Sequence, residues 1–222
     1  MAFDGPEPAD YENVRSLNRA FLALLSGDRR PPAALLPLMP ALAQRMAALA
    51  AEQAARLATA PFLLFSFRER DDQYWEHAFA TARHPDLFVE SGNIPAATRR
   101  LVAAGLGFVW QLARRNPFAA RILCGASLHW CDQLADSTLW RILVLAGRRD
   151  DVLTLRSAAD DELWHKLLED GVSEDSDVRL AAQMSAFQAV ITRPQVTMTS
   201  IWSTAACRSK RLSLHVAEDK DA

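Results

Sequence analysis

Hydrophobic side chains recur every three or four residues along most of this 222-residue chain, the period of one face of an α-helix. The longest such stretch covers residues 117–147. Asn116 is a typical N-cap, Pro117 suits the first helical position, and Gly147 suits the C-terminal end. Its apolar positions are Cys124, Leu128, Cys131, Ala135, Leu139, Ile142 and Ala146. Further apolar residues leave this predicted helix little polar surface: Leu123, Trp130, Leu134, Leu143 and Val144. The pattern therefore predicts one long buried helix, with the other helices packed around it.

Shorter helices with the same period are predicted on both sides of this stretch. They cover residues 10–26, 41–59, 71–83, 95–115 and 152–170, and a last helix begins at Ser173 or Ser176 and ends before Pro194. Pro37 and Pro40 break any helix that begins at Ala33. The apolar positions of the last helix, expected to face the core, are Leu180, Met184, Phe187 and Ile191. The fold class is therefore all-α, a single-domain bundle of about seven or eight helices around residues 117–147.

One apolar run, residues 61–67 (PFLLFSF), has no clear period. Its length fits either a buried strand or a buried helical turn. Because no other segment offers a convincing partner strand, the run is predicted to be helical or irregular, and buried.

The chain divides into three parts by pattern. Residues 1–9 are a polar, flexible lead-in, residues 10–193 form the helical domain, and residues 194–222 lack a sustained period. The last part is predicted to be a poorly ordered tail.

Composition narrows the function only slightly. Half of the residues are hydrophobic, 23% are charged and the net charge is −2, so neither nucleic acid nor an anionic membrane is expected as a partner. The sequence contains no uncharged apolar run of about 18 residues and no secretory signal. Three cysteines, an odd number, favour reduced thiols. These features predict a soluble, cytoplasmic protein.

The sharpest chemical motif is a Glu-x-x-His at Glu162 and His165. Residues three apart share a helix face, so the carboxylate and the imidazole could bind one metal ion. Such a site needs a second motif of this kind, and the nearest substitutes are Asp72 and Glu76. The alternative is a solvated acidic face with Trp164 packed beneath it. No cofactor is assigned on this half-motif alone.

A second candidate, a ligand pocket, lies within residues 117–147. His129, Gln133 and Asp136 follow one another at helical spacing, and Trp130 and Trp140 supply large apolar surfaces beside them. If the helix is central, these polar groups must find partners in the core. The alternative is a satisfied polar network, or the exposed edge of the helix.

No catalytic constellation is complete. No Gly-x-Ser-x-Gly elbow is present, and Gly105 and Gly107 follow no strand and lack the third glycine of a nucleotide loop. The sequence therefore favours a non-catalytic protein that binds a protein partner or forms a homo-oligomer. A helical sensor for an apolar small molecule is one alternative, and a metal-dependent enzyme using the carboxylate–histidine site is the other.

Overall fold

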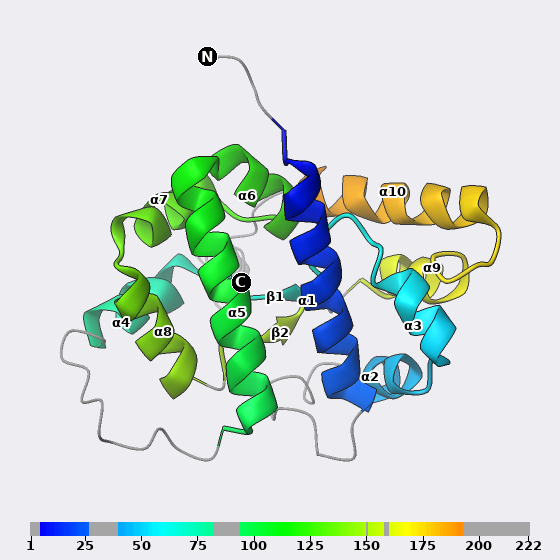
Figure 1. Ribbon diagram of the computed structural model, residues 1–222, viewed down its shortest axis with the longest axis horizontal. Coiled ribbons are helices and arrows are strands. Elements are labelled where there is room, and N and C mark those ends of the chain that lie inside the picture. The colour runs from blue at the N-terminus through cyan, green and yellow to red at the C-terminus, as the bar shows by residue number, and fades with distance from the viewer. Residues whose placement is uncertain (1–4, 27–39, 82–93, 150, 158–159, 193–222) are drawn as a thin grey trace, which may run out of the picture. The chain divides into compact units, whose positions relative to one another are not determined.

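A computed structural model describes residues 5–26, 40–81, 94–149, 151–157 and 160–192. Within these residues the chain forms ten helices and one two-stranded sheet, which confirms the all-α class (Figure 1). The helices are α1 (Pro8–Ser26), α2 (Pro40–Ala47), α3 (Ala51–Leu57), α4 (Asp72–Thr81), α5 (Ala96–Arg115), α6 (Pro117–Cys124), α7 (Leu128–Asp136), α8 (Leu139–Arg148), α9 (Asp161–Glu169) and α10 (Ser176–Thr192). The strands are β1 (Phe65–Ser66) and β2 (Thr154–Leu155). The predicted tail, residues 194–222, lies outside the described residues, as do residues 1–4 of the predicted lead-in.

The predicted long helix over residues 117–147 is wrong, because three helices, α6, α7 and α8, occupy that stretch. Gly125 has a φ of 65° and ends α6, donating its N–H to Arg121 O at 2.7 Å. Ser127 caps α7 and Thr138 caps α8, each side chain accepting a backbone N–H from three residues further on. The apolar period continues across both breaks, so the period alone does not reveal them.

The helix that contacts most of its neighbours is α5, which packs against α1, α6, α7 and α8. In Figure 1, α1 and α5 run side by side through the middle of the helical domain. Gly105 of α5 lies against the ring of buried Phe67, where an added Cβ would come within 2.4 Å of Phe67 Cζ. The absence of a side chain at residue 105 therefore lets this ring pack directly on the α5 backbone.

The run 61–67 is buried, as predicted, but the helical alternative is wrong. It is irregular apart from β1, which pairs antiparallel with β2 so that Phe65 lies opposite Leu155. The partner strand falls inside the region predicted as a helix from 152 to 170. The helix there, α9, begins only at Asp161, after Asp160 caps it by accepting the N–H of Leu163 at 3.0 Å.

Two further expectations on helices differ from the structure. The predicted helix 41–59 is divided into α2 and α3. On α10 the predicted core positions Leu180, Met184 and Ile191 are exposed, while the side that packs inward carries Ala182, Ala186 and Val190. Small side chains let α10 approach the domain closely, and they leave the large ones outside.

The described residues also show where the helical domain begins. Residues 1–192 form one compact unit by their contacts, and α1 begins at Pro8, two residues before the predicted start. None of the helices in the described part of the chain is both long and apolar enough to cross a bilayer.

Candidate functional site

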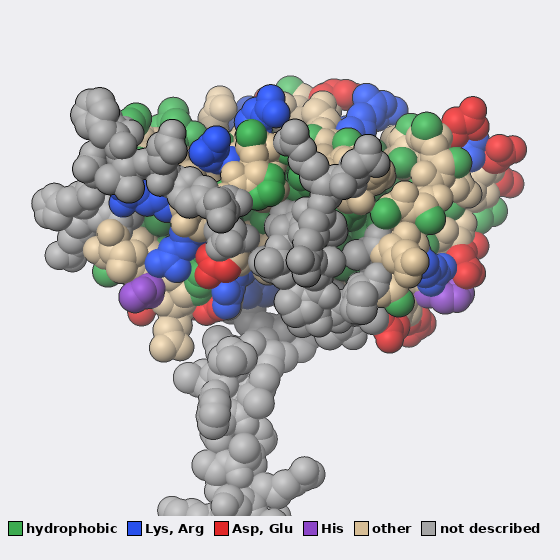
Figure 2. All heavy atoms as spheres, turned by 90° about the horizontal axis from the view of Figure 1, so that it is seen from below, with side chains coloured by type: hydrophobic (Ala, Val, Ile, Leu, Met, Phe, Trp, Pro, Cys, Tyr) green, Lys and Arg blue, Asp and Glu red, His purple; other side chains and the backbone are tan. Residues whose placement is uncertain are grey.

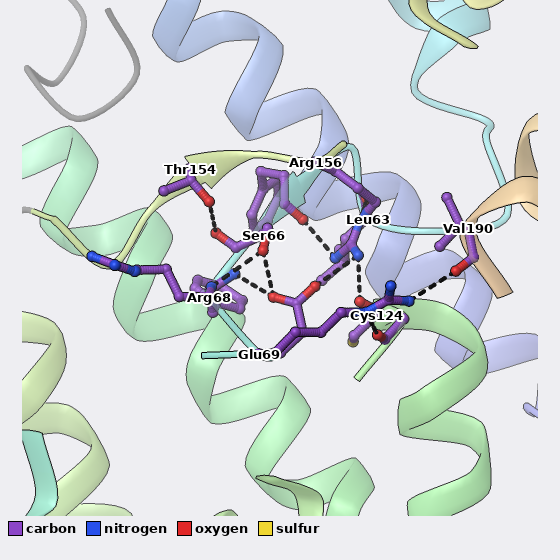
Figure 3. Close-up of polar contacts among 12 residues, drawn as sticks. Leu63, Ser66, Arg68, Glu69, Cys124, Thr154, Arg156 and Val190 are labelled. Atoms are coloured by element: carbon purple, nitrogen blue, oxygen red, sulfur yellow. Dashed lines mark hydrogen bonds and ion pairs between the residues drawn. The ribbon is translucent and has the colours of Figure 1, made fainter. Parts of the chain in front are cut away.

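The most developed polar arrangement is a buried ion pair between Arg156, which follows β2, and Glu69, which follows β1. The two side chains are only 5% and 3% exposed, and Arg156 Nη1 lies 2.7 Å from Glu69 Oε1 (Figure 3). The other carboxylate oxygen of Glu69 accepts hydrogen bonds from Ser66 Oγ at 2.6 Å and from the N–H of Phe67 at 2.7 Å. Both oxygens of this buried carboxylate are therefore paired, as a buried charge requires.

The rest of the Arg156 guanidinium group binds backbone carbonyls. It donates to Leu63 O, to Phe65 O at 2.8 Å and to Cys124 O at the end of α6. Carbonyls at a helix C-terminus carry partial negative charge, and the irregular run 61–67 leaves carbonyls without sheet partners. Arg156 thus supplies to these carbonyls the hydrogen-bond donors that a neighbouring strand or a further helical turn would otherwise provide.

A second arginine, Arg70, connects two helix ends beside this pair. Its Nε donates to Gly125 O at 2.8 Å, and its Nη2 donates to Val190 O at 3.0 Å, close to the C-terminus of α10 (Figure 3). Ser66, Glu69, Arg70 and Arg156 are together called the central polar cluster below. The cluster holds the run 61–67, α6 and α10 in one arrangement, which is a structural role.

Toward the surface, two arginines lie close to the aromatic ring of Tyr74. The guanidinium carbons of Arg68 and Arg149 are 4.3 Å and 5.2 Å from the ring centroid, and the Tyr74 hydroxyl donates to Asp151 Oδ1 at 2.8 Å. Burial, followed by the hydrogen bond to Asp151 and its charge, raises the pKa of Tyr74 well above its ordinary value. The phenol therefore stays a neutral donor that fixes α4 to the segment before β2.

The residues of the predicted ligand pocket are placed in different surroundings. Trp130 is fully buried, with its ring centroid 5.4 Å from that of Trp75, whereas Trp140 is 49% exposed on α8. His129 and Asp136 are exposed on α7, and Gln133 Nε2 lies 3.0 Å from His129 Nε2. Trp130 and Trp140 thus do not face a common space.

The predicted metal ligands are also separated. Glu162 and His165 are exposed on α9, where His165 Nε2 lies 3.1 Å from Glu169 Oε1. Asp72 and Glu76 belong to α4, which Figure 1 places on the opposite side of the helical domain from α9. Within the part of the chain that the structure describes, no group of three or more His, Cys, Asp or Glu side chains is placed to hold a metal ion.

Two cysteines, Cys124 and Cys131, lie in the core with free thiols. Burial raises the pKa of Cys131 to about 12 and raises that of Cys124 further. Only the thiolate is a good nucleophile, so neither residue is suited to covalent catalysis.

These two thiols give a pH-dependent prediction. An unfolded thiol has a pKa of about 8.5, so the folded state retains protons that the unfolded state loses above that pH. The contribution of the two buried thiols to the stability of the fold is complete below about pH 8.5 and is lost as the pH rises toward 12.

In a Cys207→Ala background, we expect a disulfide reagent to label Cys124 and Cys131 in the folded protein about a hundredfold or more slowly than in denaturant. The urea concentration at the unfolding midpoint should decrease when the pH is raised from 8 to 10. It should decrease less in the Cys124→Ala/Cys131→Ala variant. Fast native labelling would contradict this prediction.

The surface carries two rows of exposed large apolar side chains. The α10 row consists of Leu180, Met184 and Ile191, which are 58%, 46% and 46% exposed. The α8 row consists of Leu139, Trp140 and Leu143, also exposed, in a stretch predicted to be largely buried. The spacing of these residues predicts a helix face in the core, and for Trp140 a ligand pocket. Spacing marks which residues share a helix face, and it does not determine which face is turned to solvent.

Charge is distributed unevenly around these rows. Residues 160–177 contain eight acidic residues and one lysine, whereas residues 91–131 contain five arginines and no acidic residue. In the view from below, acidic side chains gather toward the right, the side on which Figure 1 places α9 and α10 (Figure 2). The net charge of −2 thus combines an acidic stretch, in which Glu169 and Glu174 pair with Arg45 and Arg56, and a basic stretch, in which Arg115 pairs with Glu7 and Asp10.

Comparison with known proteins adds no family to this description. No protein-family model, no curated protein and no solved structure matches the chain.

Proposed function

We propose that this protein is non-catalytic and works by protein–protein contact, through the α10 row. The observation that carries the proposal is the outward position of Leu180, Met184 and Ile191 on a helix whose other side already packs on the domain. Single exposed apolar residues are ordinary, but an aligned row is typical of a surface that a partner covers.

Two features support a surface adapted to contact rather than a loosely packed helix. Gln183 is buried and donates through Nε2 to Arg56 O at 3.1 Å and to Gly171 O at 3.3 Å, which fixes the rotation of α10 about its axis. Phe187, at the edge of the row, stacks on Phe62 with ring centroids 6.2 Å apart. The exposed row is therefore held in place by specific contacts on the other side of the same helix.

The central polar cluster fits this proposal. Its ion pair, Arg156 with Glu69, is buried, Arg70 is bound to two carbonyls, and the two thiols have raised pKa values. The cluster thus stabilises the domain that presents α10. The predicted cytoplasmic location and the absence of a cofactor stay predictions.

The test is the replacement Leu180→Asp. A charge inside a contact must lose water without gaining a partner, so we expect association to weaken about tenfold or more. Association is measured by sedimentation velocity over a concentration series and by quantitative capture from lysate of the producing cells. The matched control is Ala181→Asp, which adds the same charge at the next exposed position, outside the row.

Circular dichroism and urea unfolding should show both variants folded. Equal association by the wild type, Leu180→Asp and Ala181→Asp would contradict the proposal, because the row would then contribute nothing. Equal loss in both variants would contradict it too, because the effect would follow from the added charge alone.

A further inference from the structure

The α8 row and the α10 row belong to different sides of the same helical domain. Figure 1 shows α8 at the lower left and α10 at the upper right, with α1 and α5 between them. Within one copy the two rows therefore do not cover each other. Each has the same character, three large apolar side chains on one exposed helix face.

Acidic groups predominate beside the α10 row, where Arg56 pairs with Glu174 and Arg179 adjoins Leu180. Arginines predominate at the end of α8, whereas Asp136 is exposed before its start. Glu174, Asp175 and Asp177 are exposed at the start of α10, beside Leu180. Arg148 is exposed at the end of α8, and the exposed Arg99 and Arg100 lie at the start of α5, which packs along α8. In Figure 1 the beginning of α5 lies at the same end of the domain as the end of α8.

We propose that copies of this chain associate head to tail, with the α8 row of one copy packed on the α10 row of the next. This inference rests on the proposed function and names the partner as a second copy. Pairing α10 with α10 would offer the acidic flank, from α10 itself, only Arg179, which already donates to Ser173 O and Glu174 O, and would leave the α8 row exposed. Pairing α8 with α10 covers both rows and brings arginines to the acidic flank.

Such a contact is heterologous, so it does not close after two copies. Each added copy uses one of its rows and leaves the other free, so the assembly always ends in one free α8 row and one free α10 row and grows into a chain, unless the two ends meet in a ring. α10 is 17 residues long, about 25 Å, so a contact centred on it is at the low end of specific interfaces and should depend strongly on concentration. Because the flanking charges are exposed, added salt should weaken it.

The experiment uses two full-length variants, Leu180→Asp and Trp140→Asp, each of which blocks one row. Sedimentation velocity of the wild type should show a weight-average mass that rises beyond that of a dimer with concentration, and less so in about 0.5 M sodium chloride. Each variant alone should be a monomer. An equimolar mixture should form a one-to-one complex and nothing larger, because the α8 row of the Leu180→Asp chain and the α10 row of the Trp140→Asp chain are both intact.

Leu143→Glu, a second change in the α8 row, should behave like Trp140→Asp, and Ala181→Asp should behave like the wild type. If Trp140→Asp and Leu143→Glu assemble as the wild type does while Leu180→Asp is monomeric, the head-to-tail inference is overturned and the α10 contact stands. If the wild type and the mixture both stay monomeric, the inference is overturned as well. The proposed function then depends on the capture experiment: a captured protein that is lost with Leu180→Asp and kept with Ala181→Asp would support it, and a nucleic acid as the captured partner would contradict it.

Discussion

Replacement of Arg156 by methionine is expected to lower the free energy of unfolding by about 3–5 kcal/mol, the usual cost of removing one partner from a buried ion pair. The Glu69 carboxylate would keep its charge, at 3% exposure, without the cation 2.7 Å away. Leu63 O, Phe65 O and Cys124 O would also lose their donor. Methionine retains much of the arginine stem, so the loss would report on hydrogen bonds and charge more than on packing.

The measurement is urea unfolding followed by circular dichroism and by tryptophan fluorescence. The matched control is Arg45→Met, since Arg45 forms an ion pair with Glu169 at 3.6 Å in which both side chains are about half exposed. An exposed pair contributes about 1 kcal/mol or less. If Arg156→Met costs no more than Arg45→Met, the central polar cluster does not hold the fold together. If Arg156→Met does not fold at all, Glu69→Gln, which keeps the shape and removes the charge, should still be measurable and destabilised.

Replacement of Gly125 by alanine is expected to cost about 2–3 kcal/mol, from left-handed backbone strain and from crowding. Its φ of 65° is disfavoured for a residue with a side chain. An added Cβ would also lie 3.0 Å from Arg156 Nη1, 3.1 Å from Val190 Cγ1 and 3.3 Å from Arg70 Nη2. Both guanidinium groups are held by hydrogen bonds to carbonyls, so neither can move away freely.

The control is Gly107→Ala on α5, where an added Cβ meets nothing within 4 Å. Alanine favours a helix over glycine by about 1 kcal/mol, so this variant should be slightly more stable than the wild type. Urea unfolding of the two variants in parallel should give changes of opposite sign. A Gly125→Ala variant as stable as the wild type would mean that the αL break between α6 and α7 is not required.

Much of the helical architecture can be predicted from local sequence. The starts of α5, α6 and α10 follow from Pro95, Asn116 and the acidic residues before Val178, because caps and helix dipoles act over a single turn. The burial of residues 61–67 follows from their composition, because so many large apolar side chains are too costly to leave in water.

The candidate surface could be predicted only in part. The period of Leu180, Met184 and Ile191 is visible in the sequence, but the helix has apolar residues on every side. Its orientation depends on which side fits the neighbouring surface, and the small side chains Ala182 and Ala186 fit more closely than the large ones. Which side of α10 fits better can be judged only when the position of the neighbouring helix, α9, is known.

By itself, the sequence determined that the chain is helical, approximately where most helices lie and which run must be buried, because these properties depend on residues within a few positions of one another. Only the tertiary structure decided the breaks in residues 117–147, the pairing of β1 with β2 and the outward side of α10. Arg156 and Glu69 are 87 residues apart, and Arg70 and Val190 are 120 apart. No local pattern relates residues so distant, and their contact exists only after the helices that carry them have packed.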